Sequence, residues 1–220
     1  QVAQEEERIL MEAFHWRYHP LAKRLIELVE NQSIGQITNI EASFCVPLPF
    51  SSDIRYNPQL AGGALMDTGC YTIHILRHVM QQEPEVISAT AIKHSEGIDR
   101  TMKAELSFPD GAMGSIHCSI WGWPLLSVSA KLVGTEGTIS VMNPILPQLV
   151  YHHISIQNSS GKTTERFGDA NTYVEQLRVF CSAIQKGESL LTSSKDGIKN
   201  MRIIDAIYRK AGMSPRLSWK

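Results

Sequence analysis

The chain has 220 residues, a formal net charge of -1, and apolar and charged fractions of 43% and 20%. This composition is ordinary for a globular protein with a sizeable core, and the charge gives no electrostatic reason to expect nucleic acid or an anionic membrane as a partner. No apolar run approaches the roughly 18 to 20 residues needed to cross a bilayer. The four cysteines lie far apart, which excludes a disulfide-rich scaffold and predicts reduced thiols in a cytoplasmic protein.

The N-terminal residues are expected to belong to an element that starts before the sequence does. Residues 1–8 are acidic and helix-like, as in a helix cut in mid-course, so we expect them to be the end of a helix from a preceding domain. Residues 9–220 are then expected to form one domain.

Hydrophobic periodicity predicts the first elements of that domain in order. The apolar run 9–14 indicates a short buried strand. Pro20 stands at a plausible first helical turn, and leucines follow it at helical spacing. Residues 37–46 are rich in β-forming residues and indicate a strand, and the pattern over 64–80 predicts a helix.

The second half of the chain changes character. Short β-branched runs separated by glycine turns over 86–157 predict five to seven antiparallel strands, with Asp110-Gly111 as the strongest hairpin signal. Helical periodicity returns over 171–186 and 195–213. This order predicts an α+β fold: an open, antiparallel-rich mixed sheet with helices on one face. Large apolar residues in the strand region favour a dimer that covers the other face of the sheet; they are Met113, Trp121, Trp123 and Met142.

Several nucleotide-binding and hydrolytic motifs are absent from the sequence. It contains neither a G-x-G-x-x-G nor a phosphate-binding G-x-x-x-x-G-K-[ST], and neither G-x-S-x-G nor H-E-x-x-H. His152 and His153 are adjacent, so on a strand they point to opposite faces and cannot chelate one ion. We therefore expect no metal site.

One candidate cluster lies on the helix over 64–80. Asp67, Tyr71 and His74 recur at i, i+4 and i+7, so they share one helical face and could line a polar pocket. Gly62-Gly63, directly before this helix, could expose backbone N–H groups to an anionic ligand. Alternatively, Tyr71 packs in the core and Asp67 forms only local hydrogen bonds.

A second cluster lies between the strand predicted over 9–14 and the helix that follows. Arg17 offers a fork of donors suited to a carboxylate or phosphate, and His15 and Trp16 could form a wall for a flat ring. The alternative is an aromatic plug between layers, with Arg17 paired to an acid.

The two clusters together resemble the Gfo/Idh/MocA oxidoreductases, in the branch with dihydrodiol dehydrogenase, D-xylose dehydrogenase and glucose-fructose oxidoreductase. The family's E-A-x-x-x-R-x-x-P segment is matched by Glu12, Ala13, Arg17 and Pro20. Its G-G-x-L-x-D-x-G-x-[HY] segment is matched by Gly62, Gly63, Leu65, Asp67, Gly69 and Tyr71.

This resemblance implies a two-domain enzyme whose N-terminal Rossmann domain is not in this chain. Residues 9–220 would then be the substrate-binding and oligomerisation domain, forming a homodimer through the sheet face. The implied reaction is hydride transfer between NADP, or NAD, and a sugar, polyol or dihydrodiol-type substrate. Tyr71 would donate or accept the proton, and Asp67, the second catalytic residue, would orient substrate hydroxyls or the active-site helix.

The resemblance also assigns the remaining candidates. Contacts to the cofactor, most of which the missing domain would bind, are expected from Arg17, Gly62 and Gly63. Contacts to the substrate are expected from His15, Trp16, Arg55 and His74. The family's assisting lysine stands in a Glu-Lys-Pro motif that this chain lacks, so we expect no turnover by the chain alone. The alternative function is a non-catalytic binding or assembly domain that keeps the fold.

Overall fold

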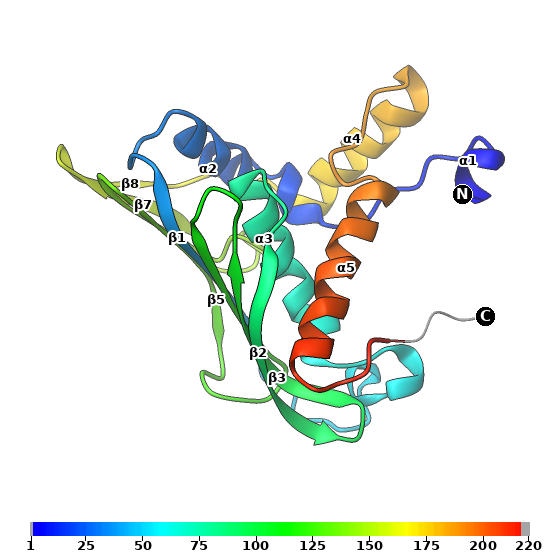
Figure 1. Cartoon of the computed structure of the whole chain (residues 1–220). Coiled ribbons are helices and arrows are strands. Elements are labelled where there is room, and N and C mark those ends of the chain that lie inside the picture. Colours follow the sequence, from blue (N-terminus) through cyan, green and yellow to red (C-terminus); the bar gives the residue numbers. More distant parts are fainter. Residues whose placement is uncertain (1, 217–220) are drawn as a thin grey trace.

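The computed structural model describes residues 2–216, in which one eight-stranded mixed sheet carries helices on one face (Figure 1). The α-helices are α1 (Val2–Glu5), α2 (Pro20–Glu30), α3 (Cys70–Met80), α4 (Thr172–Lys186) and α5 (Ser194–Lys210). The short turns are η1 (His15–Tyr18), η2 (Ile54–Tyr56), η3 (Pro58–Leu60) and the π-helical η4 (Leu65–Gly69). The strands are β1 (Ile37–Cys45), β2 (Glu85–Ser95), β3 (Ile98–Ser107), β4 (Met113–Ser119), β5 (Ser127–Gly134), β6 (Gly137–Met142), β7 (His153–Asn158) and β8 (Gly161–Glu165).

The strand order is β2-β3-β4-β1-β5-β6-β7-β8. Strand β1 runs parallel to β4 and antiparallel to β5, and the other neighbouring pairs are antiparallel. The predicted hairpin at Asp110-Gly111 joins β3 to β4, with Gly111 at a φ of +89°. The first strand of the sheet is thus inserted at its centre, between two meanders. This confirms the predicted α+β class with a mixed, mostly antiparallel sheet.

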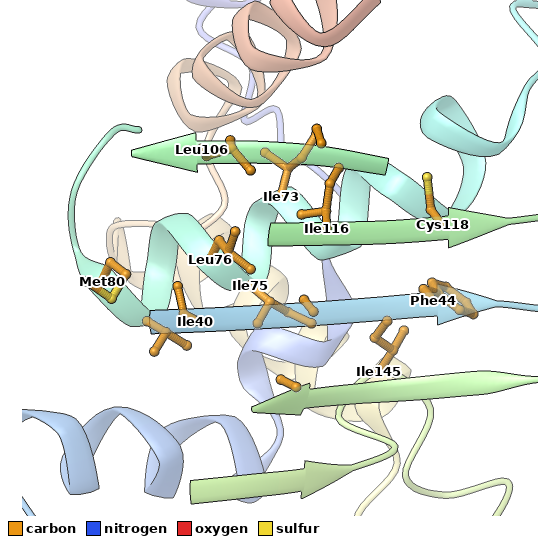
Figure 2. Close-up of a cluster of buried hydrophobic side chains, with 14 of the residues drawn as sticks. Ile40, Phe44, Ile73, Ile75, Leu76, Met80, Leu106, Ile116, Cys118 and Ile145 are labelled. Atoms are coloured by element: carbon orange, nitrogen blue, oxygen red, sulfur yellow. The ribbon is translucent and has the colours of Figure 1, made fainter. Parts of the chain in front are cut away.

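The core lies between the sheet and helix α3. Figure 2 shows Ile73 and Leu76 of α3 among side chains of the neighbouring strands, including Ile40 of β1 and Ile116 of β4. These four side chains are at most 3% exposed. Because α3 is packed over β1 and β4, its N-terminal end is fixed relative to the strands. That end carries the sequence motif around Tyr71.

The helix predicted over 64–80 begins with the π-helical turn η4 and continues as α3. Gly69 lies at the junction, and a Cβ at this position would come within 2.8 Å of the Cys118 sulfur on β4. The absence of a side chain therefore allows the turn to pack directly on the sheet.

The uncovered face of the sheet is polar at its centre. Serine, lysine, glutamate and histidine side chains there line a shallow hollow that includes Glu41, Ser43, Lys103, His117 and Lys131. Apolar side chains are exposed away from this hollow, with Trp123 85% and Met142 47% exposed. None of the described helices combines the length and hydrophobicity needed to span a membrane.

The strand predicted over 9–14 is wrong. Ile9 and Leu10 are exposed, and the segment forms only an isolated bridge between Met11 and Ser193 before the turn η1. The apolar run has no neighbouring strand of the sheet to pair with, and it lies instead along the segment that precedes α5. Phe14 is the only buried residue of this run.

Candidate active site

Tyr71 lies in an aromatic environment at the start of α3. Its ring is edge-on to Phe14 at 5.5 Å, and the His15 and Phe44 rings are 5.7 Å and 5.8 Å away, centroid to centroid. The side chain is half-buried. It borders a hollow of about 210 Å³ between residues 12–14, the start of α3 and α5. The ring is thus held on several sides while one side stays open.

The surroundings of Tyr71 favour the neutral phenol. Burial raises its pKa above the ordinary value, and the neighbouring Cys70, Tyr173 and Asp67 raise it further. Within the part of the chain that the structure describes, the Tyr71 hydroxyl forms no hydrogen bond. A phenolate at this position therefore needs a cation brought from elsewhere.

Asp67 and Arg55 form an ion pair next to this site. Arg55 Nε donates to Asp67 Oδ1 at 3.0 Å, and Asp53 also interacts with the same guanidinium. The Arg55 side chain remains 39% exposed and the Asp67 side chain 29% exposed. The pairing raises the pKa of Arg55, with Asp67 as the main cause. Arg55 therefore orients the carboxylate, and both groups keep hydrogen-bonding capacity toward solvent.

His15 and Tyr173 form a second aromatic contact beside Tyr71. The His15 and Tyr173 rings are 4.2 Å apart, and His15 is almost fully buried. Burial lowers the pKa of His15 to about 4, so its imidazole is neutral at pH 7. Tyr173 is 54% exposed. Tyr173 was not singled out from the sequence as a site residue, because its only local signal is a place in the first turn after the Asn171 cap.

Trp16 and His74 are fully buried, and their side chains form a hydrogen bond with each other. Trp16 Nε1 donates to His74 Nδ1 at 2.9 Å, and His74 Nε2 lies 3.0 Å from Asp196 Oδ2. Since Nδ1 accepts from the indole, the proton of the neutral ring stands on Nε2 and is donated to Asp196. The expectation that Trp16 and His74 contact the substrate directly is therefore not supported, since neither side chain has exposed surface.

His74 links the aromatic contacts of Tyr71 to helix α5. The Phe14 ring stacks on His74 at 3.8 Å, and the same Phe14 is edge-on to Tyr71. Asp196 stands in the first turn of α5 and also accepts from Arg77 at 2.9 Å. The hydrogen bonds of Trp16, His74, Arg77 and Asp196 thus connect η1, α3 and α5.

His74, His78 and Asp196 bring three potential metal-ligand atoms within 4.8 Å of one another. Two features oppose metal binding here. The Trp16 N–H points at His74 Nδ1, and a neutral histidine that offered Nε2 to a metal would turn an N–H of its own toward that donor. In addition, the Arg77 guanidinium already neutralises Asp196. The cluster is therefore a hydrogen-bonded ion network.

The diglycine does not offer the donors that the sequence suggested. The amides of Gly62 and Gly63 donate to the carbonyls of Asn57 and Arg55, at 3.0 Å and 2.8 Å. The amide of Leu65 at the helix start donates to Asp99 Oδ2 at 2.7 Å. These three amides are thus occupied within the chain, which removes the predicted reason for Gly62 and Gly63 to bind the cofactor.

Arg17 lies away from Tyr71. It lines a separate hollow of about 400 Å³ together with Glu30, His78 and Asp196, and its buried Nε has no hydrogen-bond partner in the described chain. The motif therefore splits around η1, with His15 on the side of Tyr71 and Arg17 in the other hollow. Direct contact between Arg17 and a ligand at Tyr71 is not supported by this arrangement.

The family model for the GFO/IDH/MocA C-terminal domain matches residues 22–140. The chain belongs to this family. The match extends from helix α2 to β6 and includes Phe44, Asp67 and Tyr71, whereas Phe14, His15 and Tyr173 lie outside the matched residues.

Curated relatives in the family are dehydrogenases and reductases. The chain is 30% identical over 205 residues to "D-xylose 1-dehydrogenase (NADP(+)) 2" of Haloferax volcanii, which covers 92% of this chain and 62% of that protein. It is 32% identical over 139 residues to trans-1,2-dihydrobenzene-1,2-diol dehydrogenase of Sus scrofa, covering 61% and 40%. The chain thus spans less than two thirds of the length of these relatives.

Solved structures show the same fold. An aldose-aldose oxidoreductase from Caulobacter crescentus, complexed with glycerol, aligns with a TM-score of 0.87 at 21% identity, covering 95% of this chain and 63% of that one. A 3-ketoreductase from Actinomadura kijaniata, in complex with NADP and TDP-benzene, aligns with a TM-score of 0.86 at 22% identity, covering 95% and 64%.

Proposed function

We propose that this chain is the substrate-binding part of an NADP-dependent oxidoreductase that acts on the CH–OH or carbonyl group of a sugar, polyol or dihydrodiol. The observation that carries the proposal is the placement of Tyr71, half-buried in an aromatic cage beside the Arg55–Asp67 ion pair. The NADP-dependent D-xylose dehydrogenase and the dihydrodiol dehydrogenase among the relatives support the reaction class.

The nicotinamide would accept or return the hydride at the reacting carbon. This chain would transfer the proton that accompanies the hydride. During oxidation the Tyr71 oxygen takes the proton of the substrate hydroxyl, and during reduction it returns one to the carbonyl oxygen. Asp67, oriented by Arg55, accepts hydrogen bonds from neighbouring substrate hydroxyls. His15, whose ring centroid lies 5.7 Å from that of Tyr71, is neutral and can donate or accept a hydrogen bond without adding charge.

The raised pKa of Tyr71 explains why we expect this chain to need a second domain. The groups that shift this pKa all raise it, so the phenolate form requires a cation from outside the described residues. We propose that a preceding dinucleotide-binding domain supplies it as the lysine of a Glu-Lys-Pro motif, and also binds most of the cofactor. The isolated chain would then bind substrate weakly and not turn over.

The surface around α4 fits the docking of such a domain. Figure 1 shows α4 and α1 extending from the helical side of the molecule, away from the sheet. Large apolar side chains are exposed on α4 and nearby segments: Leu10, Tyr173, Leu177, Ile184 and Ile198. The exposure of several large apolar side chains on and near one helix favours a surface that another protein surface covers.

We also propose that the polar, uncovered sheet face forms a homodimer contact. Two such faces related by a two-fold axis could pair the lysines and glutamates of one copy with those of the other. The unpaired thiols of Cys45 and Cys118 are buried, which fits a protein that works in the cytoplasm.

The direct test begins with the coding sequence upstream of Gln1. We expect roughly 100 to 130 residues there, a length suited to one domain, with a glycine-rich turn after a strand and a Glu-Lys-Pro. In the protein expressed with that region, Tyr71→Phe should lower kcat about 10²- to 10⁴-fold with little change in KM. Tyr151→Phe, at a half-exposed tyrosine outside the site, is the matched control.

Two outcomes would contradict the proposal. Full activity of Tyr71→Phe in the assembled protein would remove the catalytic role. Absence of any dinucleotide-binding region, together with no NADP-dependent turnover in the presence of any partner domain, would instead favour a non-catalytic binding or assembly domain.

A further inference from the structure

Arg216, at the C-terminal end of the described chain, is largely buried and contacts three segments: the diglycine, residues 97–99 and the end of α5. Its side chain is 10% exposed. One guanidinium nitrogen donates to the Gly62 carbonyl at 2.7 Å and to Asp99 Oδ1 at 3.0 Å. The same nitrogen lies 2.9 Å from the Tyr208 hydroxyl, and the other donates to the Gly97 carbonyl. The planar fork of arginine suits such convergent contacts.

Asp99 is the reason a cation is needed at this place. The carboxylate is fully buried, and it accepts from the Leu65 amide at 2.7 Å and from the Tyr208 hydroxyl at 2.9 Å. A buried carboxylate without a cationic partner is strongly destabilising, because the desolvation of the charge is left uncompensated. Arg216 provides that partner, and so the start of the π-helical turn η4 is tied to the C-terminal segment.

The same contacts reach the Arg55–Asp67 pair through the backbone. The Gly63 amide donates to the Arg55 carbonyl at 2.8 Å, and a Cβ on Gly62 would lie 2.4 Å from that carbonyl oxygen. The Asp67 amide donates to the Gly63 carbonyl at 3.1 Å. The backbones of both ion-pair residues are therefore anchored on the diglycine that Arg216 holds.

We propose that Arg216 is a positioning residue for the Arg55–Asp67 pair, acting through Gly62-Gly63 and Asp99. This inference rests on the proposed function, because that function gives the pair its role toward substrate. In this proposal Arg216 fixes the position of the diglycine, so that the Arg55 side chain can form its ion pair with the Asp67 carboxylate.

The test is amide hydrogen exchange and side-chain NMR on the 220-residue chain. The variant is Arg216→Met, which keeps an unbranched apolar side chain and removes the guanidinium with its charge. Arg209→Met is the matched control, because Arg209 is 64% exposed and forms only a peripheral pair with Asp205. Exchange at the Gly63 and Leu65 amides should become about tenfold faster in Arg216→Met and should not change in the control.

A purely stabilising role would give a different pattern. It would accelerate exchange throughout the chain, whereas the proposal expects the Leu132 and Ile139 amides, paired between β5 and β6, to stay within about twofold of the wild type. The Arg55 Nε–H resonance is a second readout, expected to shift or broaden only in the Arg216 variant. Unchanged exchange at Gly63 and Leu65, or an equal acceleration at all these amides, would overturn the proposal.

Arg216→Lys covers the case in which the methionine variant does not fold. Lysine keeps a charge near Asp99 but cannot span the Gly62 and Gly97 carbonyls, so we expect an intermediate, local acceleration at Gly63. Exchange identical to the wild type in this variant would also reject the proposal. These readouts do not depend on turnover, so a failed Tyr71→Phe test leaves them interpretable, and the reverse also holds.

Discussion

The indole N–H of Trp16 and Nδ1 of His74, 2.9 Å apart and both fully buried, join the two sequence motifs of this chain by a direct hydrogen bond. The bond fixes which nitrogen of His74 carries the proton, and that proton points to Asp196. Two residues that the sequence assigned to ligand contact thus form part of the support beneath Tyr71.

Trp16→Phe should therefore destabilise the chain. The substitution removes the donor and leaves His74 Nδ1 buried without a partner, which costs about 1–3 kcal/mol in addition to any loss of packing. Urea denaturation of the wild type and the variant measures the difference. Trp123→Phe, at a side chain that is 85% exposed, should change the free energy of unfolding by less than about 0.5 kcal/mol. Equal effects of the two substitutions would contradict the interpretation.

The buried histidines predict a loss of stability in mild acid. Burial lowers the pKa of His15 to about 4 and that of His74 to about 3, from an ordinary value of 6.5. Below pH 6.5 the unfolded chain binds protons at these positions that the folded chain does not, so stability is full above pH 6.5 and falls as the pH drops toward 4. Each histidine contributes a slope of up to about 1.4 kcal/mol per pH unit.

Denaturant midpoints between pH 7.5 and 4.5 measure that slope. His15→Gln should remove part of it, because one suppressed protonation is then absent. Part of the remainder comes from His19 and His117, whose pKa values burial also lowers. A free energy of unfolding that stays level, or rises, as the pH falls from 6.5 to 4.5 would show that the two imidazoles are not held neutral.

The elements that could be predicted from the sequence are those with local signals. The Asp110-Gly111 turn determines its own hairpin, since the φ values that such a turn requires favour these residues. The parallel pairing of β1 with β4 has no such signal. Residues 37–45 and 113–119 are separated by a helix and two strands, and only the burial of both beneath α3 brings them together.

The candidate site divides in the same way. The spacing of Asp67 and Tyr71 is local and predicted that the two side chains share one helical face. The catalytic role of Tyr71 came from the family resemblance and stays a prediction. Asp196 and Arg216 come from distant segments and follow no motif, so their contacts with His74 and Gly62 required the fold. The diglycine was predicted to expose its amides to a ligand. In the structure, the missing side chain of Gly63 instead allows the close approach of Asp99.

Tyr71 should remain protonated at pH 10 in the isolated chain. Burial and its neighbours raise its pKa above the ordinary value of 10.0. Carbon-13 labelling at the tyrosine ζ position, with the signal assigned by Tyr71→Phe, measures the titration directly. Addition of a domain that carries the proposed lysine should lower this pKa. Titration at or below pH 10 without any such domain would show that the described residues already stabilise the phenolate.

Gly63 and Gly111 allow the role of the diglycine to be separated from a backbone effect. Both have positive φ values, +124° and +89°, which L side chains rarely adopt. A Cβ on Gly63 would lie 2.2 Å from Asp99 Oδ1, whereas a Cβ on Gly111 meets nothing within 4 Å. Gly111→Ala should therefore cost about 1 kcal/mol, the typical penalty of the backbone conformation alone.

Gly63→Ala should cost at least about 2 kcal/mol more than Gly111→Ala, because the new methyl group must displace a buried carboxylate from its hydrogen bonds. Thermal and urea unfolding of both variants measure the difference. In Gly63→Ala the Leu65 amide should also lose its protection from hydrogen exchange, since Asp99 is its acceptor. Equal destabilisation by the two substitutions would mean that Gly63 serves only the turn, and that the close approach of Asp99 contributes nothing measurable to this end of the site.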